Sequence, residues 1–83
     1  MRRIPVLESG DIRVVRVESE GEDTIPEHTH EADEVAYVER GSAEITVEGK
    51  AFRVGEGEAL LIPKGAKHWA SLRNCTLIAF YHP

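Results

Sequence analysis

Two histidines and a glutamate lie close together in the sequence, and a third histidine lies far downstream. His28 and His30 are two residues apart, so on an extended strand both side chains share one face, with Cα atoms about 6.6 Å apart. Glu34 follows a short acidic corner, and its carboxylate can return to the same face. His68 comes after a Pro-Lys-Gly segment at 63–65, which predicts a sharp turn that directs the next strand inward. We expect the four side chains to converge.

Three imidazoles and one carboxylate form a donor set of intermediate hardness. Such a set suits a divalent transition metal, namely Mn, Fe, Ni, Co, Cu or Zn, and suits Ca or Mg poorly. The metal would keep one or two positions for water or substrate. Each residue also has an ordinary alternative: a solvated histidine pair, a glutamate on an exposed face and a hydrogen-bonded histidine inside a barrel.

Short strands must position these groups. The segments rich in Val, Ile, Thr and aromatic residues are 11–18, 24–30, 34–39, 43–47, 51–54, 59–62, 67–72 and 76–81. No stretch of eleven or more residues carries an uninterrupted helical apolar stripe, so the sequence predicts an all-β sandwich or barrel. Glu48-Gly49 is expected to form a tight hairpin turn, and Gly41-Ser42 is expected to reverse the chain before it.

Strand alternation predicts what surrounds the four groups. The side chains expected to face inward beside Glu34 and His68 are Ala36, Val38, Ala70 and Leu72. This wall is small and apolar and supplies no acid or base. The last strand offers Tyr81 or His82 as a candidate catalytic residue. Alternation does not choose between them, because both faces of that strand are apolar.

The spacing of these residues resembles the two-motif signature of the cupin superfamily. The first motif is Gly21, six residues, His28-x-His30, three residues, Glu34, six residues and Gly41; the second is Gly57, five residues, Pro63-x-Gly65, two residues and His68. The resemblance implies a double-stranded β-helix, or jelly-roll, barrel with His28, His30, Glu34 and His68 as ligands of one metal. The first gap is one residue longer than the common form, and Leu72 replaces the usual Asn, which leaves the subfamily open.

Length and composition limit the possible functions. The chain has 83 residues, which predicts a single domain over 1–83, and its net charge of −5 argues against nucleic-acid binding. The one adjacent basic pair, Arg2-Arg3, is interpreted as a solvated N-terminal tip. Cys75 stands alone, which favours a small core residue. No signal-peptide pattern and no apolar run of about 20 residues is present, so we expect a cytoplasmic protein without membrane insertion.

Two functional hypotheses follow. The first is a metal-dependent enzyme acting on a small molecule; the cupin resemblance implies dioxygenase-, isomerase- or decarboxylase-like chemistry. The second is a binding or sensing module that holds a small ligand without turnover, and a weaker third is a metal that only stabilises the fold. For each of the first two we expect a homodimer, because so short a barrel has exposed edges and apolar residues beyond the needs of one thin core.

Overall fold

The computed structural model describes residues 1–83 and contains seven strands and no helix. The strands are β1 (Arg2–Ser9), β2 (Ile12–Glu18), β3 (Glu22–His28), β4 (Asp33–Val47), β5 (Lys50–Gly55), β6 (Ala59–Ile62) and β7 (His68–His82). Every strand pairing is antiparallel. The all-β prediction is confirmed. None of the elements is a helix with the length and hydropathy that a bilayer crossing requires.

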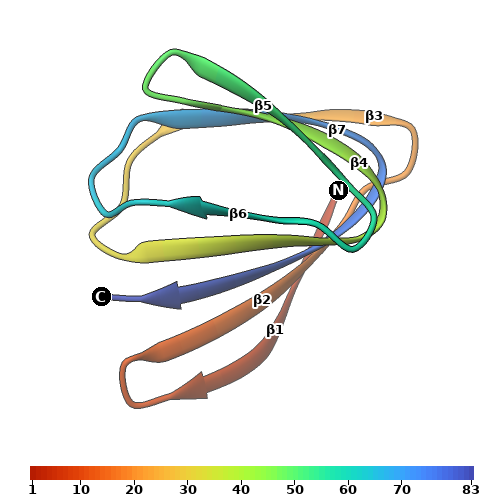
Figure 1. Ribbon diagram of the computed structural model, residues 1–83. Helices are drawn as coiled ribbons and strands as arrows, with labels where there is room; N and C mark the ends of the chain where they lie inside the picture. Colours follow the sequence, from red (N-terminus) through yellow and green to blue (C-terminus); the bar gives the residue numbers. More distant parts are fainter.

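The two long strands, β4 and β7, pair along most of their length and bend together between two layers (Figure 1). The first half of β4 and the second half of β7 lie with β6, β2 and β1, and we call this the β1 layer. The other halves lie with β3 and β5 in the β3 layer. The layers face each other across the core, which gives the jelly-roll barrel that the sequence predicted.

The bend is made by residues with left-handed backbone conformations. Gly41 in β4 has φ 77° and Asn74 in β7 has φ 44°, and the ladder between the strands shifts register from Val38 to Ser42. A Cβ atom on Gly41 would collide with the carbonyl oxygen of Asn74, so only glycine fits. The predicted chain reversal at Gly41-Ser42 is therefore wrong: the positive φ produces a bulge that redirects the strand without ending it.

The bend explains why four predicted segments form two strands, and an exposed edge explains the strand that was not predicted. The predicted segments 34–39 and 43–47 are the two halves of β4, and 67–72 and 76–81 are the two halves of β7. Strand β1 was not predicted, and Arg2-Arg3 belongs to it instead of to a solvated tip. This strand pairs only with β2 and has a bulge next to Pro5, as an edge strand tolerates. Its almost fully exposed residues give no burial pattern to detect.

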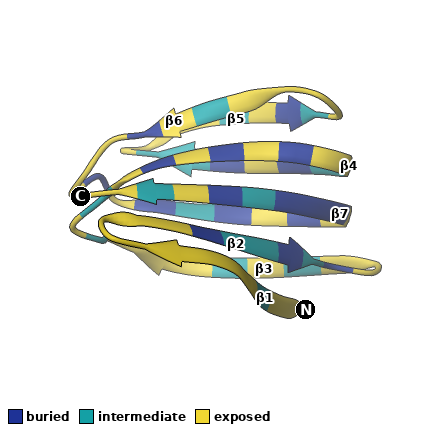
Figure 2. Ribbon diagram, turned by 90° about the horizontal axis from the view of Figure 1, so that it is seen from below, coloured by how far each residue is buried: buried dark blue, intermediate teal, exposed yellow.

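The core lies between the layers. The residues predicted to face inward, Ala36, Val38, Ala70 and Leu72, are all buried. Buried and exposed residues alternate along β4 and β7, as Figure 2 shows in a view onto the outside of the β1 layer. The predicted hairpin at Glu48-Gly49 is confirmed, because Val47 pairs with Lys50 and both turn residues have positive φ, at 47° and 81°. The barrel thus has the interior that strand alternation predicted.

Candidate metal centre

The four predicted metal-binding residues meet at the end of the barrel away from the bend. His28 ends β3 and is the cross-strand partner of His68, which begins β7. Glu34 is the second residue of β4, and His30 lies in the connection between β3 and β4. A backbone hydrogen bond of 2.9 Å from Gly65 N–H to the carbonyl oxygen of His30 joins this connection to the one before β7. The donors thus come from both layers.

Distances between the donor atoms match a shared ion. Ligand atoms of His28, His30 and His68 all lie within 4.8 Å of one another. Oε1 of Glu34 lies 2.9 Å from Nε2 of His30 and 3.7 Å from Nε2 of His68. Atoms bound to one ion at about 2.1 Å lie about 3–4 Å apart, depending on the coordination angle. The cluster can therefore hold one metal after small adjustments.

Each imidazole is oriented by its second nitrogen. The three Nδ1 atoms lie within 2.9 Å of backbone carbonyl oxygens, in the pairs His28 with Pro26, His30 with Ala32 and His68 with Ala66. A carbonyl oxygen only accepts, so each Nδ1 must carry the proton and donate it. This leaves the Nε2 lone pairs of the neutral rings free, and it is the arrangement by which proteins orient metal-binding histidines.

The contact between His30 and Glu34 requires a positive charge. With the Nδ1 proton of His30 donated to a carbonyl, the Nε2 lone pair would face the carboxylate oxygen at 2.9 Å, and two acceptors repel each other. A proton on either residue or a cation between the two residues removes this repulsion. Nε2 of His68 is buried and has no hydrogen-bond partner. An ion placed among these atoms would satisfy both requirements.

Burial favours the neutral form of the His68 imidazole. The side chains of His68 and Glu34 are only 5% and 8% exposed, whereas His28 is exposed. Burial lowers the pKa of His68, since the charged imidazolium is disfavoured away from water, and the Ala66 carbonyl and Glu34 oppose this only partly. A neutral ring is the form that binds a metal. The site therefore has a buried floor and an open side at His28.

A small cavity of about 30 Å³ lies beside the cluster. His28, Glu34 and His68 line one side, and apolar side chains such as Ala36 and Ile45 line most of the rest. Two residues of the predicted apolar wall, Ala36 and Ala70, line this cavity, whereas Val38 and Leu72 are buried outside its wall. This space holds little more than a water-sized group, so a larger ligand would have to lie at the exposed mouth, next to His28.

The two candidates on the last strand differ in their position relative to the cavity. Tyr81 lines the cavity, and its ring centroid lies 5.3 Å from that of His30, whereas His82 is exposed and lies in no part of the cavity wall. The pKa of Tyr81 is raised by burial and by the charge of Glu34. At neutral pH Tyr81 therefore carries its proton and can donate a hydrogen bond.

Two arginines near the mouth were missed by the sequence analysis. Arg3 lines the same cavity, and the guanidinium carbon of Arg13 lies 4.6 Å from the Tyr81 ring centroid. Arg3 lies in the strand that was not predicted. Arg13 is opposite Tyr81 in the ladder between β2 and β7. That pairing could have been found only if the register of the last strand had been known.

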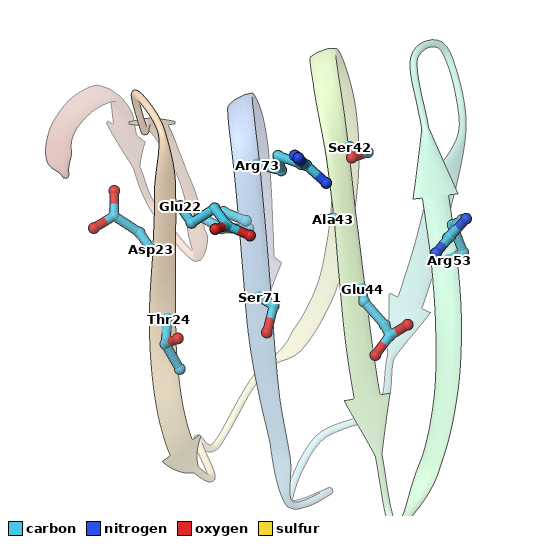
Figure 3. Close-up of a pocket in the computed structure, with 10 residues that line it drawn as sticks. Glu22, Asp23, Thr24, Ser42, Ala43, Glu44, Arg53, Ser71 and Arg73 are labelled. Carbon is cyan, nitrogen blue, oxygen red and sulfur yellow. The ribbon is translucent and has the colours of Figure 1, made fainter.

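A larger hollow of about 540 Å³ lies elsewhere, on the outer surface of the β3 layer (Figure 3). Its walls include Glu22, Glu44, Arg53, Ser71 and Arg73, which are exposed side chains of mixed charge. It contains no histidine and no buried polar group aimed into it. The smaller cavity, not this hollow, adjoins the residues with metal-binding chemistry.

Comparison with known proteins agrees with this description. The family model for the cupin domain matches residues 13–77, and the chain therefore belongs to the cupin family. No curated protein matches it.

Several solved structures have the same fold. KdgF from Halomonas sp. superposes with a TM-score of 0.90 at 27% identity, over 98% of this chain and 76% of that one. A cupin-2 domain containing protein from Shewanella frigidimarina gives a TM-score of 0.81 at 26% identity, over 99% and 80% of the two chains. An RmlC-like cupin from the same organism gives 0.91 at 21% identity, over 98% and 74%.

Proposed function

We propose that this cupin binds one divalent transition metal through His28, His30, Glu34 and His68, and binds a small molecule at the open side of that metal. The donor set suits Mn, Fe, Ni, Co, Cu or Zn. The metal would act as a Lewis acid or, if it is redox-active, would activate oxygen. The open side is next to His28, the one exposed member of the cluster.

The observation that carries the proposal is the unpartnered Nε2 atom of His68. Buried polar atoms in proteins nearly always have a partner, and leaving one without costs about 1–3 kcal/mol. Here the atom points to a carboxylate at 3.7 Å, beside two further imidazoles. A metal supplies the missing partner and also separates His30 from Glu34. A hydrogen-bonded barrel histidine, the ordinary alternative for His68, would not leave Nε2 unpaired.

The test is metal content after purification without a metal-chelating tag. Elemental analysis of the wild-type chain, stripped and then reloaded with one metal at a time, should give one ion per chain. His28→Ala and His68→Ala should reduce this content strongly, whereas His82→Ala removes an exposed imidazole outside the cluster and should leave it unchanged. Equal loss in all three variants, or no metal in the wild type, would refute the proposed site.

We favour an enzyme over a simple binding protein, and the position of Tyr81 beside the cluster supports this choice. The tyrosine hydroxyl gives the pocket a proton donor beside the cluster, which the strands that carry Glu34 and His68 lack. Dioxygenase-, isomerase- or decarboxylase-like reactions are all compatible with a metal and one proton donor. The alternative is a binding or sensing module with the same metal site.

Oxygen uptake and product formation distinguish an enzyme from a binding or sensing module. The metal-loaded protein is incubated with a panel of catechols, flavonols and small keto acids, and dissolved oxygen and organic products are followed together. Turnover that falls in Tyr81→Phe while metal content stays constant supports an enzyme. Saturable binding of a panel member without any conversion supports the binding module.

We also propose that the protein is a homodimer that buries the outside of the β1 layer. Cross-strand partners form one apolar row across all five strands of this layer: Leu61, Val35, Phe80, Val14 and Leu7. Four members of the row are exposed, at 60% for Leu61, 47% for Leu7, 42% for Phe80 and 39% for Val35, whereas Val14 is buried. Exposed apolar side chains gathered on one face mark interaction sites in soluble proteins.

Polar groups border this row, as in a protein interface with an apolar centre and a polar rim. Asp33 and His82 form the next cross-strand pair toward one end, and the ion pair of Arg16 with Glu39, at 2.9 Å, lies toward the other. A five-stranded face with about 4.8 Å between strands has roughly the size of a standard dimer interface, about 800 Å² per partner. A second copy of this chain is the occupant we propose.

A cytoplasmic location is the remaining part of the proposal. Cys75, the one cysteine, is buried and free. Burial raises the pKa of its thiol and so disfavours the reactive thiolate. A fold that uses no disulfide is compatible with a reducing compartment, and fractionation of the native host would test the location directly.

A further inference from the structure

Arg3, which lines the cavity beside the metal cluster, and Arg13, which lies over the Tyr81 ring, lack acidic partners. Neither Arg3 nor Arg13 forms an ion pair, although the chain has 15 acidic residues. Their neighbours on the same two strands behave differently: Arg2 and Arg16 both bind Glu18. Arg40, Arg53 and Arg73 also form no ion pair, so what distinguishes Arg3 and Arg13 is their position beside Tyr81.

Tyr81 links both arginines to the cluster. The guanidinium carbon of Arg13 lies 4.6 Å from the Tyr81 ring centroid, and Arg3 lines the cavity together with Tyr81. The Tyr81 ring centroid also lies 5.3 Å from that of His30, and Tyr81 is the cross-strand partner of Glu34. Both arginines also oppose the rise in the pKa of Tyr81, as nearby positive charges do. The positive groups thus lie one side chain away from the metal-binding residues.

The charges at this mouth do not cancel. Arg3 and Arg13 both act on Tyr81 as positive charges, and Glu34 is the one carboxylate that acts on it; a bound divalent ion would offset the charge of Glu34. Glu8 is opposite Arg13 in the ladder but forms no ion pair with it. The chain as a whole carries −5, so a positive mouth would attract anions selectively against a repelling surface.

We infer that Arg3, Arg13 and the Tyr81 hydroxyl form an anion subsite, and that the small ligand of the proposed metal centre is an organic carboxylate. This inference rests on the proposed function. The planar fork of an arginine matches a carboxylate, and a tyrosine hydroxyl can donate a further hydrogen bond to it. The cavity is too small for the whole ligand. The carboxylate therefore lies at the mouth, with the adjoining polar atoms toward the metal.

The test uses the full chain loaded with Co²⁺, whose visible absorption reports its ligands. Co²⁺ stoichiometry is measured first, and pyruvate, glycolate and acetate are then titrated by calorimetry and by absorption. Pyruvamide, which has no negative charge, and inorganic phosphate are the control ligands. The variants are Arg3→Gln and Arg13→Gln, with Arg53→Gln in the distant outer hollow as the matched control.

We expect at least one carboxylate to bind the wild type and to bind each mouth variant about tenfold more weakly, as the loss of a charge-assisted hydrogen bond predicts. Arg53→Gln should bind like the wild type, pyruvamide should bind much more weakly than pyruvate, and Co²⁺ content should be equal in all variants. Circular dichroism checks that each variant is folded.

Other outcomes separate the anion subsite from the proposed metal centre. No binding by any carboxylate, equal binding by the mouth variants, or equal binding of pyruvamide would overturn the inference and leave the metal site standing. Tighter, arginine-dependent binding of phosphate would overturn the choice of a carboxylate. Failure of Co²⁺ to bind the wild type would refute the proposed function, whereas arginine-dependent binding of pyruvate in that same protein would still support the subsite.

Discussion

Nε2 of His68 lies 3.7 Å from Oε1 of Glu34, and it has no hydrogen-bond partner although the side chain is buried. The two residues belong to different strands and different layers of the barrel. Without a shared cation, their contact leaves a buried polar atom unsatisfied, and the contact of His30 with Glu34 then needs a proton between the two residues. The stability of the fold should therefore depend on what occupies this position.

Removal of the metal should lower the melting temperature. A ligand that binds only the folded state stabilises it by about 2.7 kcal/mol when its free concentration is 100 times its dissociation constant. For a domain of this size that corresponds to roughly 10–20 °C. Calorimetry before and after chelation measures the shift, and a chelator should have almost no effect on His68→Ala. An identical shift in that variant would contradict the assignment of His68.

Substitution of Gly41 should destabilise the fold much more than substitution of Gly57. Both glycines have positive φ, 77° and 80°, but only at Gly41 would a Cβ meet another backbone, at Asn74. Gly57→Ala should cost about 1–2 kcal/mol from its backbone conformation alone. Gly41→Ala should cost about 1–3 kcal/mol more, from the forced shift of a neighbouring strand. Urea unfolding of the two variants gives the difference, and similar losses would argue against a close approach at the bend.

Gly49 and Gly41 show the limits of sequence reasoning. Turn residues at 48–49 predicted a hairpin correctly, because two residues suffice to reverse an antiparallel pair. The same logic failed at Gly41, since a positive φ serves a bulge as well as a turn. Only the partner strand, with its own left-handed residue at Asn74, distinguishes the two cases.

The candidate site was predictable where it depended on local spacing. His28, His30 and Glu34 are close in sequence, which was enough to group them, although His30 lies in the connection after β3 and not on the strand that alternation assumed. Tyr81 was not separable from His82, because Phe80 and Ile78 make the outer face of β7 as apolar as its inner face. Arg3 could not be found, since its position depends on an edge strand without a burial pattern.

The proposed dimer should dissociate when a charge enters its apolar face. Phe80→Asp places a carboxylate at the centre of the exposed row on the β1 layer, where burial would leave it unpaired. Ser71→Asp makes the matched change on the outside of the β3 layer. Sedimentation at micromolar concentration should give a dimer for the wild type and for Ser71→Asp, and a monomer for Phe80→Asp. A monomeric wild type would exclude the dimer.

High pH should destabilise the protein through Cys75. Burial raises the pKa of this thiol above its usual 9.0, and Arg40 opposes the rise only partly. Above pH 9 the unfolded chain loses the thiol proton while the folded chain keeps it, so unfolding becomes easier. The contribution of Cys75 to stability is complete below pH 9 and is lost as the pH rises through the higher pKa of the folded state.

Urea unfolding from about pH 8 to about pH 10 measures this dependence. In Cys75→Ala the loss of stability over this range should be smaller than in the wild type, even though the substitution leaves a cavity. A thiol reagent should also react with the native protein only as fast as Cys75 becomes exposed. Rapid reaction under native conditions would show that the thiol is accessible.

Because β4 and β7 run through both layers, the two ends of the barrel should differ in how easily they open. At the bend the layers are joined by two hydrogen-bonded strands, whereas at the other end only the connections 29–32 and 63–67 join them (Figure 1). Breathing of the barrel should therefore be largest at that second end, where backbone amides would exchange with solvent fastest. An ion held there by residues from both layers would suppress this opening, so that occupancy of the site and rigidity of the molecule rise together.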